Sequence, residues 1–167
     1  MIESALLHHH ESRQWLSFEH PVAVLHARKP TEVLPLLNEI EARVEAETLT
    51  AVGYVTYEAA SGLDASLPTH PPPDNALPLI SFALFREAHA VQAPTSAQAQ
   101  AHQQWRFSES AEDYQLAIHR IRERIKAGDV YQINHTTRLN GVLNDPWQLF
   151  TEAAAGAPFG AYLQGDS

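Results

Sequence analysis

Two stretches of the sequence interrupt the regular patterns on either side of them, one because of its prolines and the other because of its low apolar content. Leu67–Pro78 contains five prolines, and proline lacks a backbone N–H and fixes φ, so it interrupts both helices and sheets. Gln92–Gln104 is almost wholly Ala, Gln, Ser, Thr, Pro and His. Such a composition offers too little apolar surface to offset the entropy of ordering the chain. We therefore predict a loop in the first stretch and a flexible linker in the second.

The chain of 167 residues is long enough for one domain with a core, or for one domain and the first elements of a second. The two interruptions favour the second arrangement. We predict an N-terminal region at residues 1–91, a linker at residues 92–108, and the start of a further region at residues 109–167.

Three segments have the pattern of amphipathic helices. In Thr31–Thr48 the apolar residues recur at steps of four, three and four, with Thr31 as the expected cap and Pro35 in the first turn. Ser110 precedes a second helix, which Gly128 is expected to end. The buried faces of these two helices are predicted to be Val33, Leu37, Ile40 and Val44, and Tyr114, Ile118, Ile121 and Ile125.

The third helix begins after Asp145, a capping residue that is followed by a proline at the first helical position. Its apolar face carries Trp147 and Phe150, and Gly156 is expected to end it. Like the helix that follows Ser110, this segment begins after a capping residue and ends at a glycine, so we predict a short helix here.

Short runs of β-branched and aromatic residues predict strands between these helices. With helices and strands interspersed, we predict an α+β fold of mostly antiparallel β layers, packed like a sandwich, with flanking helices. The expected strands are Pro21–Ala27, Ala51–Tyr57, Leu79–Phe85 and Phe159–Leu163, and the expected core aromatics are Tyr54, Tyr57, Phe82 and Phe85.

The segment Ala127–Leu139 alternates apolar and polar side chains after a helix. Alternation with period two is typical of a strand with one packed face, here Tyr131, Ile133 and Leu139. The opposite face, which includes Gln132 and Asn134, is polar and is a candidate lining for a pocket. The same two amides are equally suited to bind neighbouring backbone in a structural role.

Composition excludes several classes of function. The formal charge is -9, from 20 acidic and 11 basic side chains, which disfavours nucleic acid and anionic membrane as partners. The chain has no cysteine, so it has no disulfides, thiolate metal ligands or cysteine nucleophile. No apolar segment approaches the length needed to span a bilayer, and residues 1–10 do not resemble a signal peptide. We expect a soluble, cytoplasmic protein.

Four segments, taken in order, resemble a known enzyme family. Ala127–Asn134 (AGDVYQIN) is similar to the hallmark that opens the chorismate-binding region of aminodeoxychorismate synthase component I, a relative of anthranilate synthase component I. Gly53–Ala60, Pro78–Phe85 and Ala157–Leu163 match the same family in the same order. The resemblance implies an anthranilate synthase component I N-terminal type of fold for residues 1–91. It also implies that residues 109–167 begin the chorismate-binding region.

This resemblance implies an activity. Enzymes of this family use Mg²⁺ to add ammonia to chorismate, giving 4-amino-4-deoxychorismate for 4-aminobenzoate and folate biosynthesis, and a glutamine amidotransferase partner supplies the ammonia. In the family, a Ser-Pro-Glu motif, a lysine and the magnesium-binding glutamates follow the segment that resembles Ala157–Leu163. The present sequence does not contain them. We therefore nominate no catalytic residue, and we expect an N-terminal portion of the enzyme that is inactive on chorismate alone.

The family also has a tryptophan-binding pocket, and its positions correspond here to a set that includes His9 in the run His8–His10. Three adjacent histidines on a strand cannot all face one metal ion, so a metal site is the weaker interpretation of this run. An indole favours apolar walls with a few polar groups to orient it. The predicted residues of this tryptophan-like amino-acid pocket are Leu7, His9, Asn134, Pro158 and Phe159.

Two alternatives remain open at the level of sequence. One is a fragment of anthranilate synthase component I, which shares the same motifs. The other, from a different functional class, is a stand-alone effector-binding or interaction module that uses the same pocket.

Glu58, a lone carboxylate after a predicted strand, has no visible partner for general-base chemistry, so we expect it to have a structural role.

Overall fold

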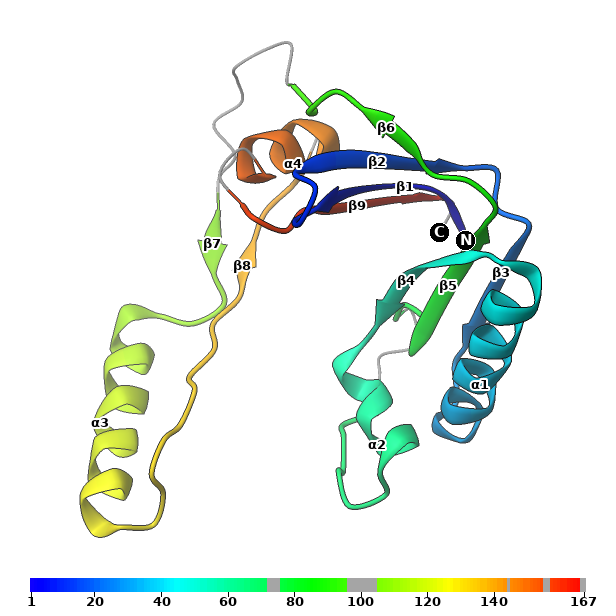
Figure 1. Ribbon diagram of the computed structural model, residues 1–167. Helices are drawn as coiled ribbons and strands as arrows, with labels where there is room; N and C mark the ends of the chain where they lie inside the picture. Colours follow the sequence, from blue (N-terminus) through cyan, green and yellow to red (C-terminus); the bar gives the residue numbers. More distant parts are fainter. Residues whose placement is uncertain (72–75, 96–104, 144, 155–156, 166–167) are drawn as a thin grey trace. The chain divides into compact units, whose positions relative to one another are not determined.

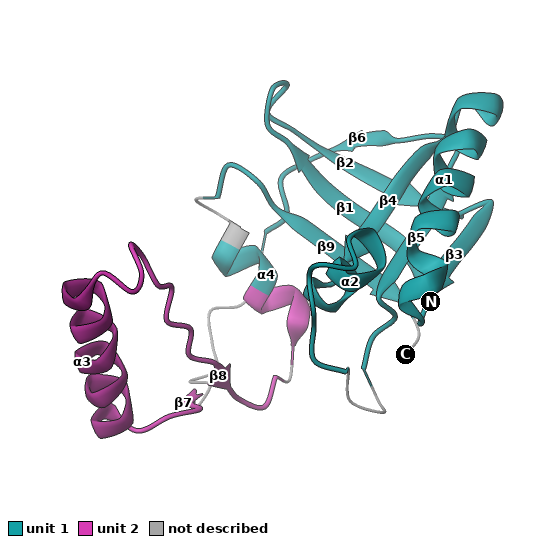
Figure 2. Cartoon of the chain, turned by 90° about the horizontal axis from the view of Figure 1, so that it is seen from below, with its two compact units in different colours: residues 1–95, 150–167 teal, residues 96–149 magenta. Residues whose placement is uncertain are grey.

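A computed structural model describes residues 1–71, 76–95, 105–143, 145–154 and 157–165. The chain forms two compact units, one of residues 1–95 with 150–167 and one of residues 96–149 (Figure 2). Helices and antiparallel sheets are mixed along the chain, which confirms the predicted α+β class. No helix among the described residues is long and apolar enough to cross a membrane.

The first sheet of the larger unit has four strands in the order β6-β2-β1-β9, and all neighbours are antiparallel (Figure 1). Strand β1 (Ile2–His9) pairs with β2 (Gln14–Glu19) on one side and with β9 (Ala161–Gly165) on the other. Strand β6 (His89–Val91) extends the sheet beyond β2. One sheet therefore joins the N-terminal strand to a strand about 150 residues later in the chain.

The second sheet has three strands in the order β3-β5-β4, with β5 (Ile80–Phe85) at its centre. Its neighbours are β3 (Ala23–Ala27) and β4 (Thr50–Val55), both antiparallel to it. These strands confirm three of the predicted strand segments. After β4, Tyr57–Ala59 forms a 3-10 turn that leads into α2 (Ala60–Leu63).

The two sheets pack face to face on a shared apolar cluster. Ile2, Ala5 and Phe18 come from the four-stranded sheet, and Val52, Ala83 and Phe85 from the three-stranded sheet. The rings of Phe18 and Phe85 have centroids 5.5 Å apart, within the range of favourable aromatic contacts. The predicted sandwich-like packing is thus present in the larger unit.

Helix α1 (Pro30–Glu47) covers the other face of the three-stranded sheet. Its predicted stripe is the packed face, because Val33 belongs to one buried cluster with Ile80 and Ile40 belongs to the next with Leu84. Val33, Ile80 and Leu84 are fully buried. The side chains of β5 point alternately toward the four-stranded sheet and toward α1, as expected for a strand that is buried on both faces.

The start of α1 differs from the prediction. The helix begins at Pro30, so the cap is Lys29 rather than Thr31, and Pro35 lies in the second turn rather than the first. The Glu32 carboxylate accepts hydrogen bonds from the backbone N–H groups of Arg28 (3.2 Å) and Lys29 (3.1 Å). A carboxylate at the third helical position can thus satisfy the free amides that precede a helix, which moves the start upstream.

The backbone bonds from Lys29 and then Arg28 hold the pKa of Glu32 below its ordinary value of 4.5. A carboxyl whose folded pKa is depressed stabilises the fold above the unfolded pKa, and this contribution is lost as pH falls through the folded pKa. We therefore expect Glu32→Gln to lower the melting temperature at pH 7 and to differ little from the unmodified chain near pH 3. Glu41→Gln, at an exposed site of the same helix, is the control. Melting curves over this pH range test the prediction, and a Glu32→Gln deficit that does not depend on pH would contradict it.

The smaller unit contains α3 (Ala111–Ala127) and a short antiparallel pair, β7 (Arg106–Phe107) with β8 (Leu139–Asn140). The predicted cap of α3 is confirmed, because Asp113 N donates to Ser110 Oγ at 3.0 Å. Gly128 ends the helix with φ of 79°, a left-handed conformation that glycine adopts without steric cost.

Two predictions for this unit are wrong. The apolar stripe of α3 is not buried among the described residues, since Tyr114 is 46 % and Ile125 42 % exposed. Residues 131–138 are not a strand, and Tyr131 is 96 % exposed. A strand needs a partner for its N–H and C=O groups, and in the described part of the unit the only ladder is the two-residue pairing of β7 with β8.

Helix α4 (Pro146–Ala154) begins as predicted, with Gln148 N donating to Asp145 Oδ1 at 3.1 Å. Its predicted end at Gly156 lies outside the described residues, and so do residues 96–104 of the predicted linker at residues 92–108.

The prediction that Tyr57 is a core aromatic is wrong, because Tyr57 is 87 % exposed. It lies beyond the end of β4, in the 3-10 turn, where it no longer faces a sheet.

Candidate functional site

One face of the four-stranded sheet points away from the sandwich core and carries an aromatic cluster. It comprises Trp15 on β2, Phe150 on α4 and Tyr162 on β9. The Phe150 ring meets Trp15 edge-on at 5.7 Å and Tyr162 at 5.1 Å between centroids. Trp15 is only 8 % exposed, so Phe150 and its neighbours give this outer face a packed interior of its own.

The alternation of β1 places its last side chains on opposite faces of the sheet. Leu7 packs against the cluster between the sheets. His8 faces outward, and its ring lies 5.0 Å from that of Trp15. His9 Nδ1 lies 2.8 Å from Ser12 Oγ, and Ser12 N donates to the same nitrogen at 3.3 Å. His9 therefore organises the turn between β1 and β2.

The segment that precedes β9 is held against β1 by histidines. His8 N donates to Gly160 O at 2.8 Å, and His8 Nδ1 lies 2.8 Å from Pro158 O. A carbonyl oxygen only accepts, so Nδ1 of His8 is the donor in the second bond. The His10 ring lies 4.8 Å from the ring of Phe159. We call these contacts of His8 and His10 with Pro158, Phe159 and Gly160 the histidine clasp.

The predicted pocket residues are distributed over both units. Leu7, His9, Pro158 and Phe159 belong to the larger unit, whereas Asn134 belongs to the smaller one. The structure brings Pro158 and Phe159 to the end of β1, where the neighbours that contact them are His8 and His10. Whether these five residues form an amino-acid pocket stays a prediction.

The residues predicted for the pocket did not include His8, His10 or Trp15. The alternation of a strand puts His8 and His9, the last residues of β1, on opposite faces, and His10 follows in the turn after the strand. Trp15 is opposite His8 in the register of β1 and β2, and a register across a hairpin is not visible in the sequence until the turn is known.

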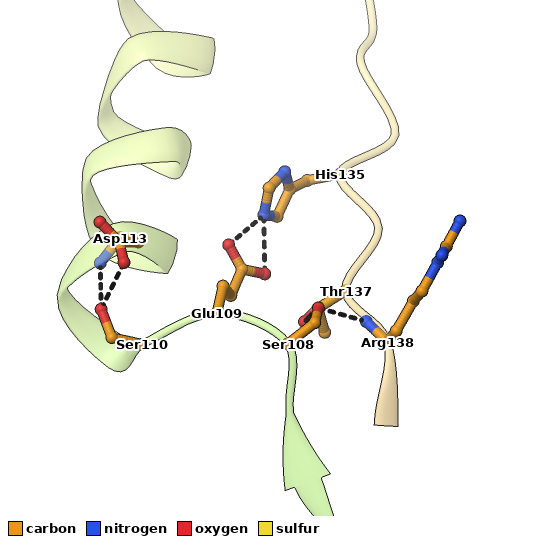
Figure 3. A network of polar contacts seen from close by, with 7 residues as sticks. All are labelled: Ser108, Glu109, Ser110, Asp113, His135, Thr137 and Arg138. Carbon is orange, nitrogen blue, oxygen red and sulfur yellow. Dashed lines mark hydrogen bonds and ion pairs between the residues drawn. The ribbon is translucent and has the colours of Figure 1, made fainter. Parts of the chain in front are cut away.

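The smaller unit contains a polar network beside the start of α3 (Figure 3). His135 Nε2 lies 3.1 Å from both carboxylate oxygens of Glu109, with the two side chains only 25 % and 20 % exposed. Ser108 Oγ accepts from Arg138 N at 3.1 Å and lies 3.3 Å from Thr137 Oγ1. These bonds tie the irregular segment 135–138 to the residues that precede α3.

The candidate ligand residue Asn134 directly precedes this segment. Its Oδ1 accepts from Gln132 Nε2 at 3.1 Å, so the two amides bind each other, and the remaining Asn134 N–H groups are the ones that could donate to a ligand. The Glu109–His135 pair ties His135, the residue next to Asn134, to the segment that precedes α3.

Glu58, which was expected to have a structural role, contributes its backbone oxygen, which accepts a hydrogen bond from Thr69 Oγ1 at 3.2 Å.

The described part of the chain contains no group of three or more His, Cys, Asp or Glu side chains that is arranged to hold a metal ion. The family resemblance implies Mg²⁺ with ligands that this sequence does not contain, and this stays a prediction.

Comparison with known proteins gives one family. Residues 90–167 match the family model of the chorismate binding enzyme. No curated protein and no solved structure matches the chain significantly. The matched residues include α3, the polar network, the clasp segment and β9, which pairs with the N-terminal strand. Residues 90–167 are therefore similar to the chorismate binding enzyme family.

Proposed function

We propose that this chain is the N-terminal portion of an aminodeoxychorismate synthase component I. Such an enzyme converts chorismate and ammonia to 4-amino-4-deoxychorismate, a precursor of 4-aminobenzoate and folate. The observation that carries the proposal is the match of residues 90–167 to the chorismate binding enzyme family. The ordered resemblance of Gly53–Ala60, Pro78–Phe85, Ala127–Asn134 and Ala157–Leu163 favours this member of the family.

The sheet topology supports a common role for the N-terminal strands and the matched residues. Strand β9 belongs to the matched region, and it pairs with β1 over the register Leu7↔Ala161 to Ile2↔Gly165. Beyond β1, the sheet continues through β2 to β6. The N-terminal strands are therefore a structural part of the unit that contains β9, as expected if residues 1–91 support a chorismate-binding region.

The proposed reaction needs groups in addition to the described residues. Mg²⁺, when bound, assists departure of the ring hydroxyl of chorismate, and a glutamine amidotransferase partner supplies ammonia. In our proposal the metal ligands and the catalytic lysine come from segments that these 167 residues do not contain, and the reaction takes place in the cytoplasm. The isolated chain is then inactive on chorismate, and its own contribution is to scaffold the fold and to bind an amino acid.

The proposal is tested by genetic complementation. The gene from which this sequence derives, placed in a bacterium that lacks aminodeoxychorismate synthase, should restore growth without added 4-aminobenzoate. The same gene should not relieve the tryptophan requirement of a strain that lacks anthranilate synthase. Rescue of the second strain alone would instead assign the chain to anthranilate synthase component I.

The proposed amino-acid pocket has a separate test. A ligand that binds only the folded state raises the melting temperature of the protein. At a free concentration of 100 times its Kd, such a ligand stabilises the fold by about 2.7 kcal/mol. We expect tryptophan to give a saturable increase in the melting temperature of the 167-residue chain, and Phe159→Ala to abolish that increase. Glycine is the control ligand, and an equal response to glycine and tryptophan would rule out a specific pocket.

A further inference from the structure

We infer that Asn140 is a site of spontaneous deamidation, and that the isoaspartate formed there opens the β7–β8 pair. Asn140 is followed by Gly141, and no other asparagine of the chain precedes a glycine. The other asparagines are Asn38, Asn75, Asn134 and Asn144. This modification is independent of the proposed enzyme function.

The reaction needs only water besides the chain itself. The backbone nitrogen of Gly141 attacks the side-chain carbonyl carbon of Asn140, the new C–N bond closes a succinimide ring, and the side-chain nitrogen leaves as ammonia. Water then opens the ring at one of its two carbonyls. Opening at the side-chain carbonyl gives aspartate. Opening at the main-chain carbonyl gives isoaspartate, in which the backbone runs through the side chain and is longer by a methylene group.

The attacking nitrogen is free in the structure. Ser108 N donates to Arg138 O at 2.8 Å, so these two residues form a hydrogen-bonded pair of the antiparallel ladder. The register places the next such pair at Arg106 and Asn140. The N–H of the following residue, Gly141, therefore points away from β7. Within the described parts of the chain it donates no hydrogen bond.

The side chain that is attacked is free as well. Asn140 is exposed, and its side-chain amide makes no hydrogen bond to any described residue. Gly141 has no Cβ to shield its nitrogen, and residues 141–143 have no regular secondary structure. Ring closure requires rotation about ψ of Asn140, which breaks the last hydrogen bond of the β7–β8 pair. Each strand of this pair has only two residues, and the end of so short a ladder opens at low cost.

Two other asparagines lack these features and serve as internal references. Asn38 lies inside α1, where the next backbone nitrogen is hydrogen-bonded along the helix. Asn134 Oδ1 accepts from Gln132 Nε2 at 3.1 Å, and the attacking nitrogen would belong to His135, which carries a side chain. We expect Asn140 to convert roughly tenfold faster than either, the factor that one hydrogen bond of ordinary strength contributes.

The two products differ in their effect on the β7–β8 pair. Aspartate leaves the backbone unchanged and places a carboxylate opposite Arg106, which is a favourable cross-strand neighbour. Isoaspartate inserts a methylene group into the backbone at this position, which displaces its C=O group from the N–H of Arg106. Since the pair has only two residues on each strand, no further ladder remains to hold the strands together.

The test incubates the folded 167-residue chain at 37 °C and pH 8 and follows the products by peptide mass spectrometry. Trypsin releases residues 139–167 as one peptide, because no Lys or Arg follows Arg138. Electron-transfer fragmentation of this peptide distinguishes aspartate from isoaspartate and separates Asn140 from Asn144.

The matched variant is Gly141→Ala, which keeps Asn140 but gives the attacking nitrogen a neighbouring side chain. In the described part of the chain the glycine with positive φ is Gly128, so alanine at position 141 causes no left-handed strain. We expect conversion of Asn140 to be fast in the unmodified chain and greatly slowed in this variant. Equal rates in the two proteins would overturn the inference.

Two further outcomes would also overturn the assignment of Asn140. One is conversion of Asn38 or Asn134 as fast as that of Asn140. The other is an intact Asn140 in the folded chain under conditions that convert it when the chain is unfolded in urea, because the fold would then protect this site.

NMR measures the effect of the modification on the β7–β8 pair. Phe107 and Leu139 form the non-hydrogen-bonded pair, in which the two Hα atoms are close enough for a strong nuclear Overhauser effect. We expect this signal in the unmodified chain and in Asn140→Asp, and its loss in the isoaspartyl form purified from the aged chain. A signal of unchanged strength in the isoaspartyl form would show that the pair stays closed and would overturn that part of the inference.

Discussion

Gly53→Ala is expected to prevent the three-stranded sheet from forming in its present register. Gly53 lies opposite Phe82 on the central strand β5. A Cβ at Gly53 would lie 2.7 Å from Phe82 Cα and 2.8 Å from Phe82 Cδ1, and it would also clash with Ser81 O. Overpacking of a core commonly costs about 1–3 kcal/mol, and we expect the upper end of that range or more because two of the obstacles are backbone atoms.

Urea denaturation followed by far-UV circular dichroism measures this effect. The control is the double variant Gly53→Ala with Phe82→Leu, which removes the aromatic ring but leaves the clash with Ser81 O. We expect it to recover little stability. Full recovery would show that the ring alone excludes a side chain at Gly53, and a single Gly53→Ala variant as stable as the parent would contradict the packing described for β4 and β5.

Phe85→Ala is expected to remove the largest fully buried side chain of the core. Phe85 joins the two sheets through its contact with Phe18, so truncation leaves a cavity between them. Phenylalanine to alanine changes in cores cost about 3–5 kcal/mol, a large part of the roughly 5–15 kcal/mol that stabilises a typical domain. The variant should therefore be partly unfolded or unfold at much lower urea.

Two further substitutions make the Phe85 result specific. Phe85→Leu retains much of the apolar volume and should lose clearly less stability than Phe85→Ala. Val55→Ala, at a residue 48 % exposed, should fall within about 0.5 kcal/mol of the parent chain. If Val55→Ala and Phe85→Ala gave equal losses, Phe85 would not be the link between the sheets.

Helix α1 and strands β3, β4 and β5 of the larger unit were predictable because their signals are local, whereas β1, β2 and β6 were not predicted. The stripe of α1 and the apolar runs of β3 and β5 appear in the sequence with the period of the structure that forms. Pairing partners are not local, and nothing in the sequence indicates that β9 lies beside β1. The start of α1 was missed because Glu32 caps it from inside the helix, reaching back to two amides upstream.

The smaller unit shows the limit of reasoning from pattern. Residues 131–138 alternate like a strand but have no ladder among the described residues, because alternation predicts which faces a strand would have and not whether it has a partner. The Ser110 cap and Gly128 stop of α3 were predictable, since they depend only on neighbouring residues. The prediction that its apolar stripe is buried was wrong, because burial depends on what packs against the helix.

The candidate site was predicted only in outline. The segment Pro158–Phe159 lies at the end of β1, where it contacts His8 and His10. The sequence did not predict these two contacts, because they depend on how the residues at the end of β1 are oriented. Contacts that depend on this orientation need the hairpin register, which only the structure provides. The proposed pocket with Leu7 and His9 stays a prediction.

The most direct test of the proposed function is to identify the reaction product. The protein isolated from its natural source would be incubated with chorismate, an ammonium salt and Mg²⁺, and the products would be separated and identified by mass spectrometry. We predict 4-amino-4-deoxychorismate, and no product from the 167-residue chain under the same conditions. Formation of anthranilate, or the absence of any chorismate-dependent product from the isolated protein, would contradict the proposal.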